Sequence, residues 1–404
     1  MISLLAFLAI VMTAAAAAAW LVRRAGPRSE GIVAGLLIGV LMGPTVLGRI
    51  APDWWAETMI GASEARAVLD RAVSERQAFV MAANAAEIPL ESRAEGIAER
   101  DASIEIASLE AADQMLRHAR PWSILTVVLA VVALWLGWSG IRRSRPKQSS
   151  PGVASTVSLA CWIVLLPGFL TILVLRLAGW SPLDPATLLV AVAVSVSAWP
   201  PGGRDARSLR RLGVWEFAVS TGLVATMLLI VPAIAARVLG SPAWSIIALP
   251  ILVFSANGVP IPESIRARRH VRHALNGVIL PGLAAISVLR SDVLLQTPWL
   301  VTIALILIAG DGRAISWLVG LRFSGLPTDG RSELEAETEA SEAMPTGTTW
   351  RTAMLMTGAG GSQLAYTAAA TALGGIGPGI TFSLVLGAAG MDLFGPSRRR
   401  VAGV

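Results

Sequence analysis

Apolar residues in this chain gather into long blocks that are separated by short polar segments. Most blocks run for about 18 to 25 residues, the length of helix that crosses a bilayer. Lipid requires each spanning segment to satisfy its own backbone N–H and C=O groups. The pattern predicts an all-α polytopic membrane protein of about eleven transmembrane helices, at residues 2–22, 31–50, 123–141, 157–179, 186–200, 213–239, 244–261, 274–289, 299–319, 352–373 and 376–393.

The charges between the blocks alternate along the chain. Every odd-numbered block is followed by basic residues, for example Arg23 and Arg24 after the first and Arg398 to Arg400 after the last. The even-numbered blocks are followed by short or nearly uncharged loops, apart from one insert. Because basic loops stay in the cytoplasm, this alternation predicts a multi-pass protein of the cell (inner) membrane, with its N-terminus outside and its C-terminus inside. The first block lacks a preceding positive region, which favours an uncleaved helix.

Two polar segments divide the chain into five parts. The insert 52–120 is expected to form an extracytoplasmic helical hairpin, with amphipathic helices over 62–83 and 95–117 joined near Pro89. It is either a solvated hairpin or a cap that binds a partner. Residues 326–350 form an acidic cytoplasmic linker. The remaining parts are the first two transmembrane helices (1–51), the transmembrane core (121–325) and the last two helices with the basic C-terminus (351–404).

Composition excludes several other classes of protein. Only 15% of the residues are charged and 54% are hydrophobic, whereas soluble domains carry about 25% charged residues. The net charge is +6, but the arginines lie in loops between apolar blocks, so we expect no binding of nucleic acid. The single cysteine, Cys161, lies in an apolar block and forms no disulfide within one chain. No catalytic, phosphate-binding or metal-binding motif is present, so we expect no enzyme activity, cofactor or metal centre.

The block from Gly31 to Gly48 is the most informative stretch of the chain. Its glycines stand mostly four residues apart, which allows close helix packing, and Gly43-Pro44 interrupts the helix near its end. The run from Gly35 to Gly48 resembles the early-helix signature of monovalent cation/proton antiporters. Three further stretches resemble that family in the same order along the chain. They are the Ser/Thr-rich segment 192–203, the late helix 308–320, in which Arg313 follows a glycine, and the segment 358–363.

The resemblance implies a fold with inverted repeats and two broken helices that cross near the middle of the membrane. The breaks fall at Pro200, Pro201, Gly202 and Gly203, and at Gly358, Gly360 and Gly361. Unwound backbone at such places exposes carbonyl groups that can hold an ion; the other interpretation is that both segments are ordinary kinked packing helices. The resemblance also implies exchange of Na⁺ or K⁺ for protons, and a homodimer.

The chain departs from the family at the position of the ion-binding acid. That acid is expected near Val224 to Thr226, but residues 217–236 contain no Asp or Glu. Hydroxyl and carbonyl oxygens can hold a monovalent cation, yet they do not take up a proton at physiological pH. The candidate oxygen ligands are Ser195, Ser197, Thr221, Thr226 and Gln363.

Asp311 and Arg313 interrupt the apolar run 300–319. A charge at that depth costs about 2.5–3.5 kcal/mol on insertion scales. Residues two apart do not face each other on a regular helix, so either the helix is broken at 310–312 or each charge has its own partner. In one interpretation Asp311 carries the proton or cation and Arg313 is the basic residue of the family. In the other, both are structural and Arg313 extends to the membrane boundary.

These features predict a membrane secondary transporter that resembles cation/proton antiporters and exchanges a monovalent cation for protons, with altered coupling. The alternative is a transport-inactive antiporter scaffold that acts as a sensor or an assembly subunit through the insert. An unrelated uniporter or channel would be favoured if the two broken segments did not meet.

Overall fold

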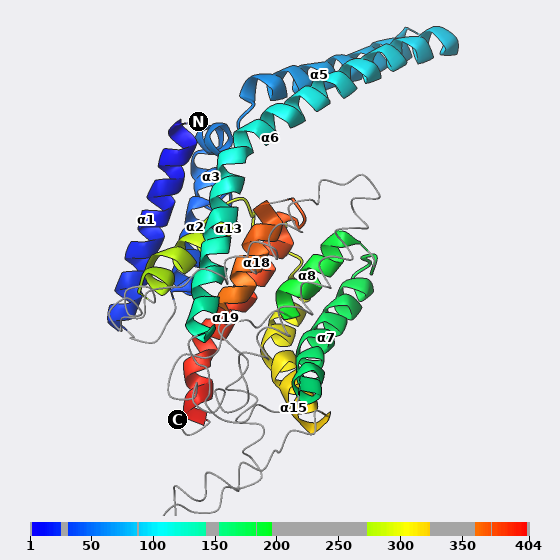
Figure 1. The fold of residues 1–404 in the computed structure, drawn as a ribbon. Helices are drawn as coiled ribbons and strands as arrows, with labels where there is room; N and C mark the ends of the chain where they lie inside the picture. The colour runs from blue at the N-terminus through cyan, green and yellow to red at the C-terminus, as the bar shows by residue number, and fades with distance from the viewer. Residues whose placement is uncertain are drawn as a thin grey trace, which may run out of the picture. The chain divides into compact units, whose positions relative to one another are not determined.

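The structure, a computed structural model, describes residues 2–25, 31–86, 89–142, 153–182, 184–195, 273–323, 360–372 and 374–401 (Figure 1). These residues form helices and turns and contain no β-strand, which confirms the predicted all-α class. The elements are α1 (Ile2–Ala25), α2 (Ile32–Met42), α3 (Leu47–Ile50), α4 (Pro52–Trp55), η1 (Ala56–Ile60), α5 (Ser63–Ala85), α6 (Leu90–Arg142), α7 (Val153–Leu177), α8 (Pro185–Ser195), η2 (Leu275–Ile279), α13 (Leu280–Val288), α14 (Trp299–Leu307), η3 (Ile308–Gly312), α15 (Arg313–Phe323), α18 (Gly361–Ala372) and α19 (Pro378–Val401).

Several of these helices are apolar enough to span a membrane. Within the described residues, four stretches are also long enough to cross it, namely Leu4–Val22, Ile32–Ile50, Glu91–Ala133 and Trp299–Gly320. Shorter apolar helices cover Cys161–Leu177, Ala186–Ser195, Leu275–Val288 and Pro378–Met391. The predicted spans 213–239 and 244–261 lie outside the described residues. These apolar helices are compatible with a membrane protein.

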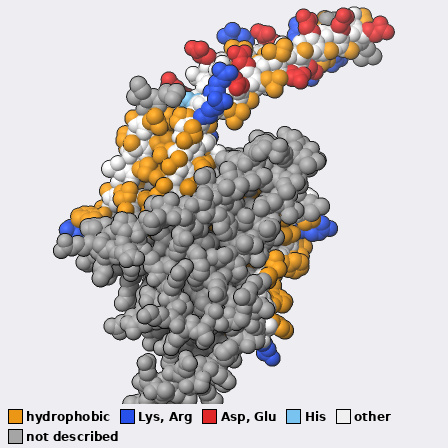
Figure 2. Space-filling model, viewed as in Figure 1, with side chains coloured by type: hydrophobic (Ala, Val, Ile, Leu, Met, Phe, Trp, Pro, Cys, Tyr) orange, Lys and Arg blue, Asp and Glu red, His pale blue; other side chains and the backbone are white. Residues whose placement is uncertain are grey.

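The chain divides into two compact units, and the first comprises residues 1–9 and 46–125. It contains the insert, in which α5 and the first part of α6 are the two predicted helices. Figure 2 shows acidic and basic side chains along these helices. The helices are tied by the ion pair between Arg76 and Asp101 and by Arg100, whose guanidinium carbon lies 3.9 Å from the ring centre of Phe79.

The second predicted helix of the insert does not end near residue 117. α6 continues without a break to Arg142, so the amphipathic segment and the predicted span 123–141 form one helix of 53 residues. Pro121 lies inside it and removes one backbone hydrogen-bond donor. The helix nevertheless passes through Pro121.

The second unit comprises residues 10–45 and 126–404, and its tightest contact joins α2 to α13. A Cβ atom at Gly35 would overlap the carbonyl oxygen of Pro281, and one at Gly39 would lie 2.6 Å from that of Ala285. Glycines four residues apart share one helix face, so the two backbones touch along successive turns. α2 ends at Met42, which confirms the predicted interruption at Gly43-Pro44.

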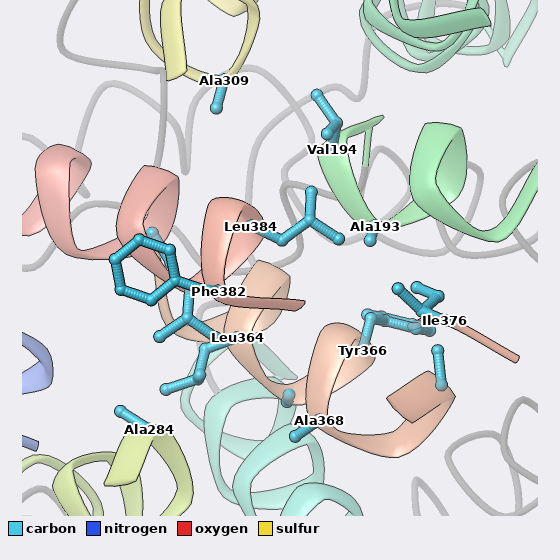
Figure 3. Packing of buried hydrophobic residues seen from close by; sticks show 14 of the residues in the cluster. Ala193, Val194, Ala284, Ala309, Leu364, Tyr366, Ala368, Ile376, Phe382 and Leu384 are labelled. Atoms are coloured by element: carbon cyan, nitrogen blue, oxygen red, sulfur yellow. The ribbon is translucent and has the colours of Figure 1, made fainter. Parts of the chain in front are cut away.

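The remaining helices of this unit pack in pairs around a shared apolar core. α18 lies against α13 and α19, α14 lies against α19, and α7 lies against both α8 and α15. Figure 3 shows the core between α8, α18 and α19, where Val194, Leu364 and Leu384 are almost fully buried. This packing places the end of α8 and the start of α18 in one apolar surrounding.

Replacement of Gly35 by alanine should destabilise the protein because the added methyl group meets backbone that cannot rotate away. Overpacking of this kind costs about 1–3 kcal/mol. The midpoint of thermal unfolding in detergent, followed by size-exclusion chromatography, should fall. Gly390→Ala is the matched control, since its new Cβ atom would meet only the side chain of Ile306 at 4.0 Å. Equal midpoints for the two variants would contradict the backbone contact.

Candidate functional site

Arg313 is the largest side chain that is fully buried in the described structure. It is the first residue of α15 and 0% of it is exposed. The described chain is one helical run from α14 through η3 to α15, and η3 is a π-helical turn over Ile308–Gly312. Such wide turns are frequent at functional sites. Arg313 therefore projects into the protein.

The guanidinium of Arg313 lies beside Val194 of α8. Its Nε atom donates to the carbonyl oxygen of Val194 at 2.7 Å, and its Nη2 atom donates to the same oxygen. Ser195, the next residue, is the last one that the structure describes in α8. A carbonyl oxygen has two lone pairs and is a suitable acceptor for a buried cation.

Gln363 links the same guanidinium to α18 and α19. Nη2 of Arg313 donates to Oε1 of Gln363 at 3.1 Å, and Nε2 of Gln363 donates to the carbonyl oxygen of Leu384 at 2.8 Å. A Cβ atom at Gly387 would lie 3.1 Å from that Nε2 atom, so this glycine makes room for the amide. Nη1 of Arg313 donates to Sδ of Met391 at 3.2 Å. One side chain thus holds α8, α18 and α19 together.

Asp311 and Ser195 lie apart from this cluster. The side chain of Asp311 is exposed, so the π-helical turn directs the two charges to different surroundings. The hydroxyl of Ser195 donates to the carbonyl of Ala191 at 2.6 Å. A Cβ atom at Gly168 would lie 2.9 Å from that hydroxyl oxygen, which shows that Ser195 faces α7. Of the predicted ion ligands in the described chain, Arg313 and Gln363 come together.

The predicted break at 200–203 lies outside the described residues, and the described part of α8 runs to Ser195. α18 begins at Gly361, and Arg313 connects Val194 of α8 to Gln363 of α18. A Cβ atom at Gly360 would overlap the carbonyl oxygen of Ala388, so only glycine fits at this position. Outside the described residues lie Ser197, Pro200, Pro201, Gly202, Gly203, Thr221, Thr226 and Gly358.

The sequence analysis missed three groups of this site. The carbonyls of Val194 and Leu384 contribute as backbone, which residue identity does not reveal, and Met391 is an ordinary apolar residue in the sequence. The signal for Val194 is the end of an apolar helix just before Pro200–Gly203. In the described part of the chain, no group of three or more His, Cys, Asp or Glu residues is arranged to hold a metal ion.

Comparison with known proteins does not extend this description. No family model matches the chain, and no curated protein and no solved structure matches it significantly.

Replacement of Gln363 by leucine should destabilise the folded protein. The variant keeps a similar volume but removes an acceptor from the Arg313 guanidinium and a donor from the Leu384 carbonyl. A hydrogen bond to a charged group contributes about 1.5–3 kcal/mol, so the thermal midpoint in detergent should drop. Gln363→Glu keeps the acceptor and should lose less stability than Gln363→Leu. If Gln363→Leu melts like the unmodified protein, the amide does not hold Arg313.

Proposed function

We propose that this chain is a multi-pass secondary transporter of the cation/proton antiporter type, which exchanges Na⁺ or K⁺ for protons. One observation carries the proposal. The fully buried guanidinium of Arg313 bridges the carbonyl of Val194 in α8 and the amide of Gln363 at the start of α18. Both residues belong to the stretches 192–203 and 358–363, for which the sequence resembles that family, and discontinuous helices that meet around a charge are typical of transporter sites.

The chemistry of the cluster suits a monovalent cation. Carbonyl and amide oxygens are hard neutral ligands. Arg313 supplies a positive charge that is already held by the carbonyl of Val194. A transported cation would bind the Val194 carbonyl in place of the guanidinium. Because one positive charge replaces another, the oxygen ligands need not carry a full negative charge.

In this proposal Asp311 carries the proton. It is the one acidic side chain described within the apolar run 299–320, and it is exposed on the surface of the protein. Asp311 and Arg313 share the π-helical turn and its junction with α15. A movement of Arg313 therefore displaces the backbone that carries Asp311. This displacement would couple cation binding at Arg313 to proton binding at Asp311 without contact between the cation and the proton.

The same proposal includes the fold, the topology and the assembly of the protein. We propose about eleven transmembrane helices in an inverted-repeat fold, an external N-terminus, a location in the inner membrane and a homodimer. The alternation of basic and weakly charged loops supports the topology. The resemblance of 35–48, 192–203 and 358–363 to antiporter motifs supports the fold.

A second function is favoured by the completeness of the contacts of Arg313. Its Nε, Nη1 and Nη2 atoms are all donors within the protein, an arrangement that can lock α8, α18 and α19 in one state. The chain would then be a transport-inactive scaffold that acts as a sensor or an assembly subunit through the insert.

Cation-dependent proton flux in proteoliposomes separates the two functions. With a pH-sensitive dye inside, addition of Na⁺ or K⁺ outside should change the internal pH for the unmodified protein. Asp311→Asn should abolish this response, because an amide does not take up a proton at physiological pH. Arg313→Gln should lose the dependence on cation concentration, while Arg313→Lys should retain part of it.

The matched control is Asp113→Asn, which removes an exposed carboxylate in α6 that pairs with Arg117. It should leave the flux unchanged. Absence of any response from folded, inserted protein would reject the antiporter and favour the scaffold. An unchanged response in Asp311→Asn would exclude Asp311 as the proton carrier.

A further inference from the structure

Three large aliphatic side chains are exposed on one side of α6 within the insert. Ile106, Leu109 and Leu116 are 68%, 65% and 66% exposed. They stand three and seven residues apart, so they share one side of the helix, and we call this set the α6 face. Contact with a partner would remove these side chains from water, which favours binding. An exposed apolar surface of this kind is typical of an interaction site.

α6 has small residues on the side that meets α5. A Cβ atom at Gly96 would lie 2.5 Å from the ring of Phe79 in α5, and the guanidinium of Arg100 lies over the same ring. Ala107 and Ala111 each follow one of these α6 residues by eleven positions, which is three helical turns, and both are buried. α6 thus buries small residues against α5 and leaves large aliphatic residues outside. A hairpin that acted alone would have the reverse pattern.

Acidic side chains border the α6 face. Glu105 precedes one of its apolar residues by four positions and Glu110 follows another by four, so the two carboxylates flank the face on opposite sides. Both are exposed, and neither forms an ion pair with any residue that the structure describes. Asp113 lies between them around the helix and pairs with Arg117 at 2.6 Å. The border of the face is therefore negative and largely uncompensated.

The charge balance of this part of α6 selects the kind of partner. The acidic residues between positions 95 and 116 are Glu95, Glu99, Asp101, Glu105, Glu110 and Asp113. The one basic residue in that range, Arg100, lies over the α5 ring instead. Figure 2 shows hydrophobic and acidic side chains next to one another along the insert. A complementary surface has an apolar stripe between basic side chains.

The same charges disfavour two other occupants. A second copy of the chain would bring two acidic borders together, and like charges that meet in an interface oppose binding. Anionic lipid headgroups attract basic segments and are repelled by acidic ones.

We propose that the α6 face binds a basic amphipathic helix of another protein. The apolar residues of that helix would pack on Ile106, Leu109 and Leu116, and its Lys or Arg side chains would pair with Glu105 and Glu110. Amphipathic helices dock in this way through apolar residues three, four and seven positions apart. The proposal gives the insert a partner of defined chemistry, and it does not rest on the ion exchange proposed above.

Photo-crosslinking in native membranes identifies what covers the α6 face. A photoreactive benzophenone amino acid replaces Leu109 in the full-length protein. The same replacement at Met81, which is exposed on α5, is the matched control. On illumination, position 109 should form an adduct with a second protein, and position 81 should not. Mass spectrometry should place the cross-link on a helical segment that has an apolar stripe between Lys or Arg residues.

Other results at position 109 would overturn the proposal. An adduct with twice the mass of the chain identifies a second copy, and an adduct with lipid identifies the membrane surface. A cross-linked segment without basic residues contradicts the charge argument. Absence of any adduct, from protein shown to be inserted, means that the face is solvated.

A defined probe tests the same chemistry without the native partner. The probe is a fluorescent synthetic helix with leucine on one side and lysine on both borders. A second helix has glutamate in place of lysine. Fluorescence anisotropy is measured with the full-length protein in nanodiscs of zwitterionic lipid. The lysine helix should bind about tenfold more tightly or better, since like charges oppose association of the glutamate helix.

Charge reversal tests the border of the face. Glu105→Lys combined with Glu110→Lys should reverse the preference, so that the glutamate helix binds more tightly. Asp70→Lys combined with Glu75→Lys changes two exposed carboxylates of α5 and is the matched control, which should keep the preference for the lysine helix. Equal binding of both helices to the unmodified protein would overturn the proposal, as would a preference that survives the change at positions 105 and 110.

A second pair of variants tests the apolar residues. Ile106→Ser combined with Leu109→Ser should weaken binding of the lysine helix by about tenfold or more, because the apolar contacts are lost. Val68→Ser combined with Met81→Ser removes two exposed apolar side chains of α5 and should leave the affinity unchanged. Since all four residues are exposed, circular dichroism should show equal helix content in both variants. Equal loss of affinity in the two variants would place binding outside the α6 face.

Discussion

The positive charge of Arg313 can be buried only where acceptors surround it, and the helices of the second unit are arranged to supply them. Burial of an unpaired ion costs more than a folded protein can tolerate. α8 has to present the carbonyl of Val194. α18 has to present Gln363, and α19 has to leave space at Gly387 for the amide. Three segments that are distant in sequence are aligned by one side chain.

Parts of this arrangement were predictable from sequence because they depend on local rules. Glycines four residues apart predict a close helix contact, and α2 makes that contact along its length. Gly43-Pro44 ends α2 because proline cannot continue the helix. Gln363 was predicted as a candidate because it is a polar side chain next to a glycine break in an apolar helix. In each case a few neighbouring residues determine the outcome.

Other parts depend on three-dimensional packing and were not predictable. Asp311 and Arg313 are equally conspicuous as charges in an apolar run, but only packing decides that Arg313 is buried while Asp311 is exposed. The carbonyl of Val194 has no signature in the identity of its side chain. The continuity of α6 was not predicted, because the change from polar to apolar residues was interpreted as the boundary between two helices. Such a change marks only a change of surroundings. The backbone can remain helical across such a change, even at Pro121.

The contact between α2 and α13 has a consequence for movement. Helices that touch through side chains can slide, since rotamers change and the interface repacks. At Gly35 and Gly39 the opposing surface is backbone, and backbone offers no rotamers to rearrange. α2 and α13 therefore move together as one rigid body. Any sliding of helices during a conformational change has to occur at interfaces formed by larger side chains, such as that between α14 and α19.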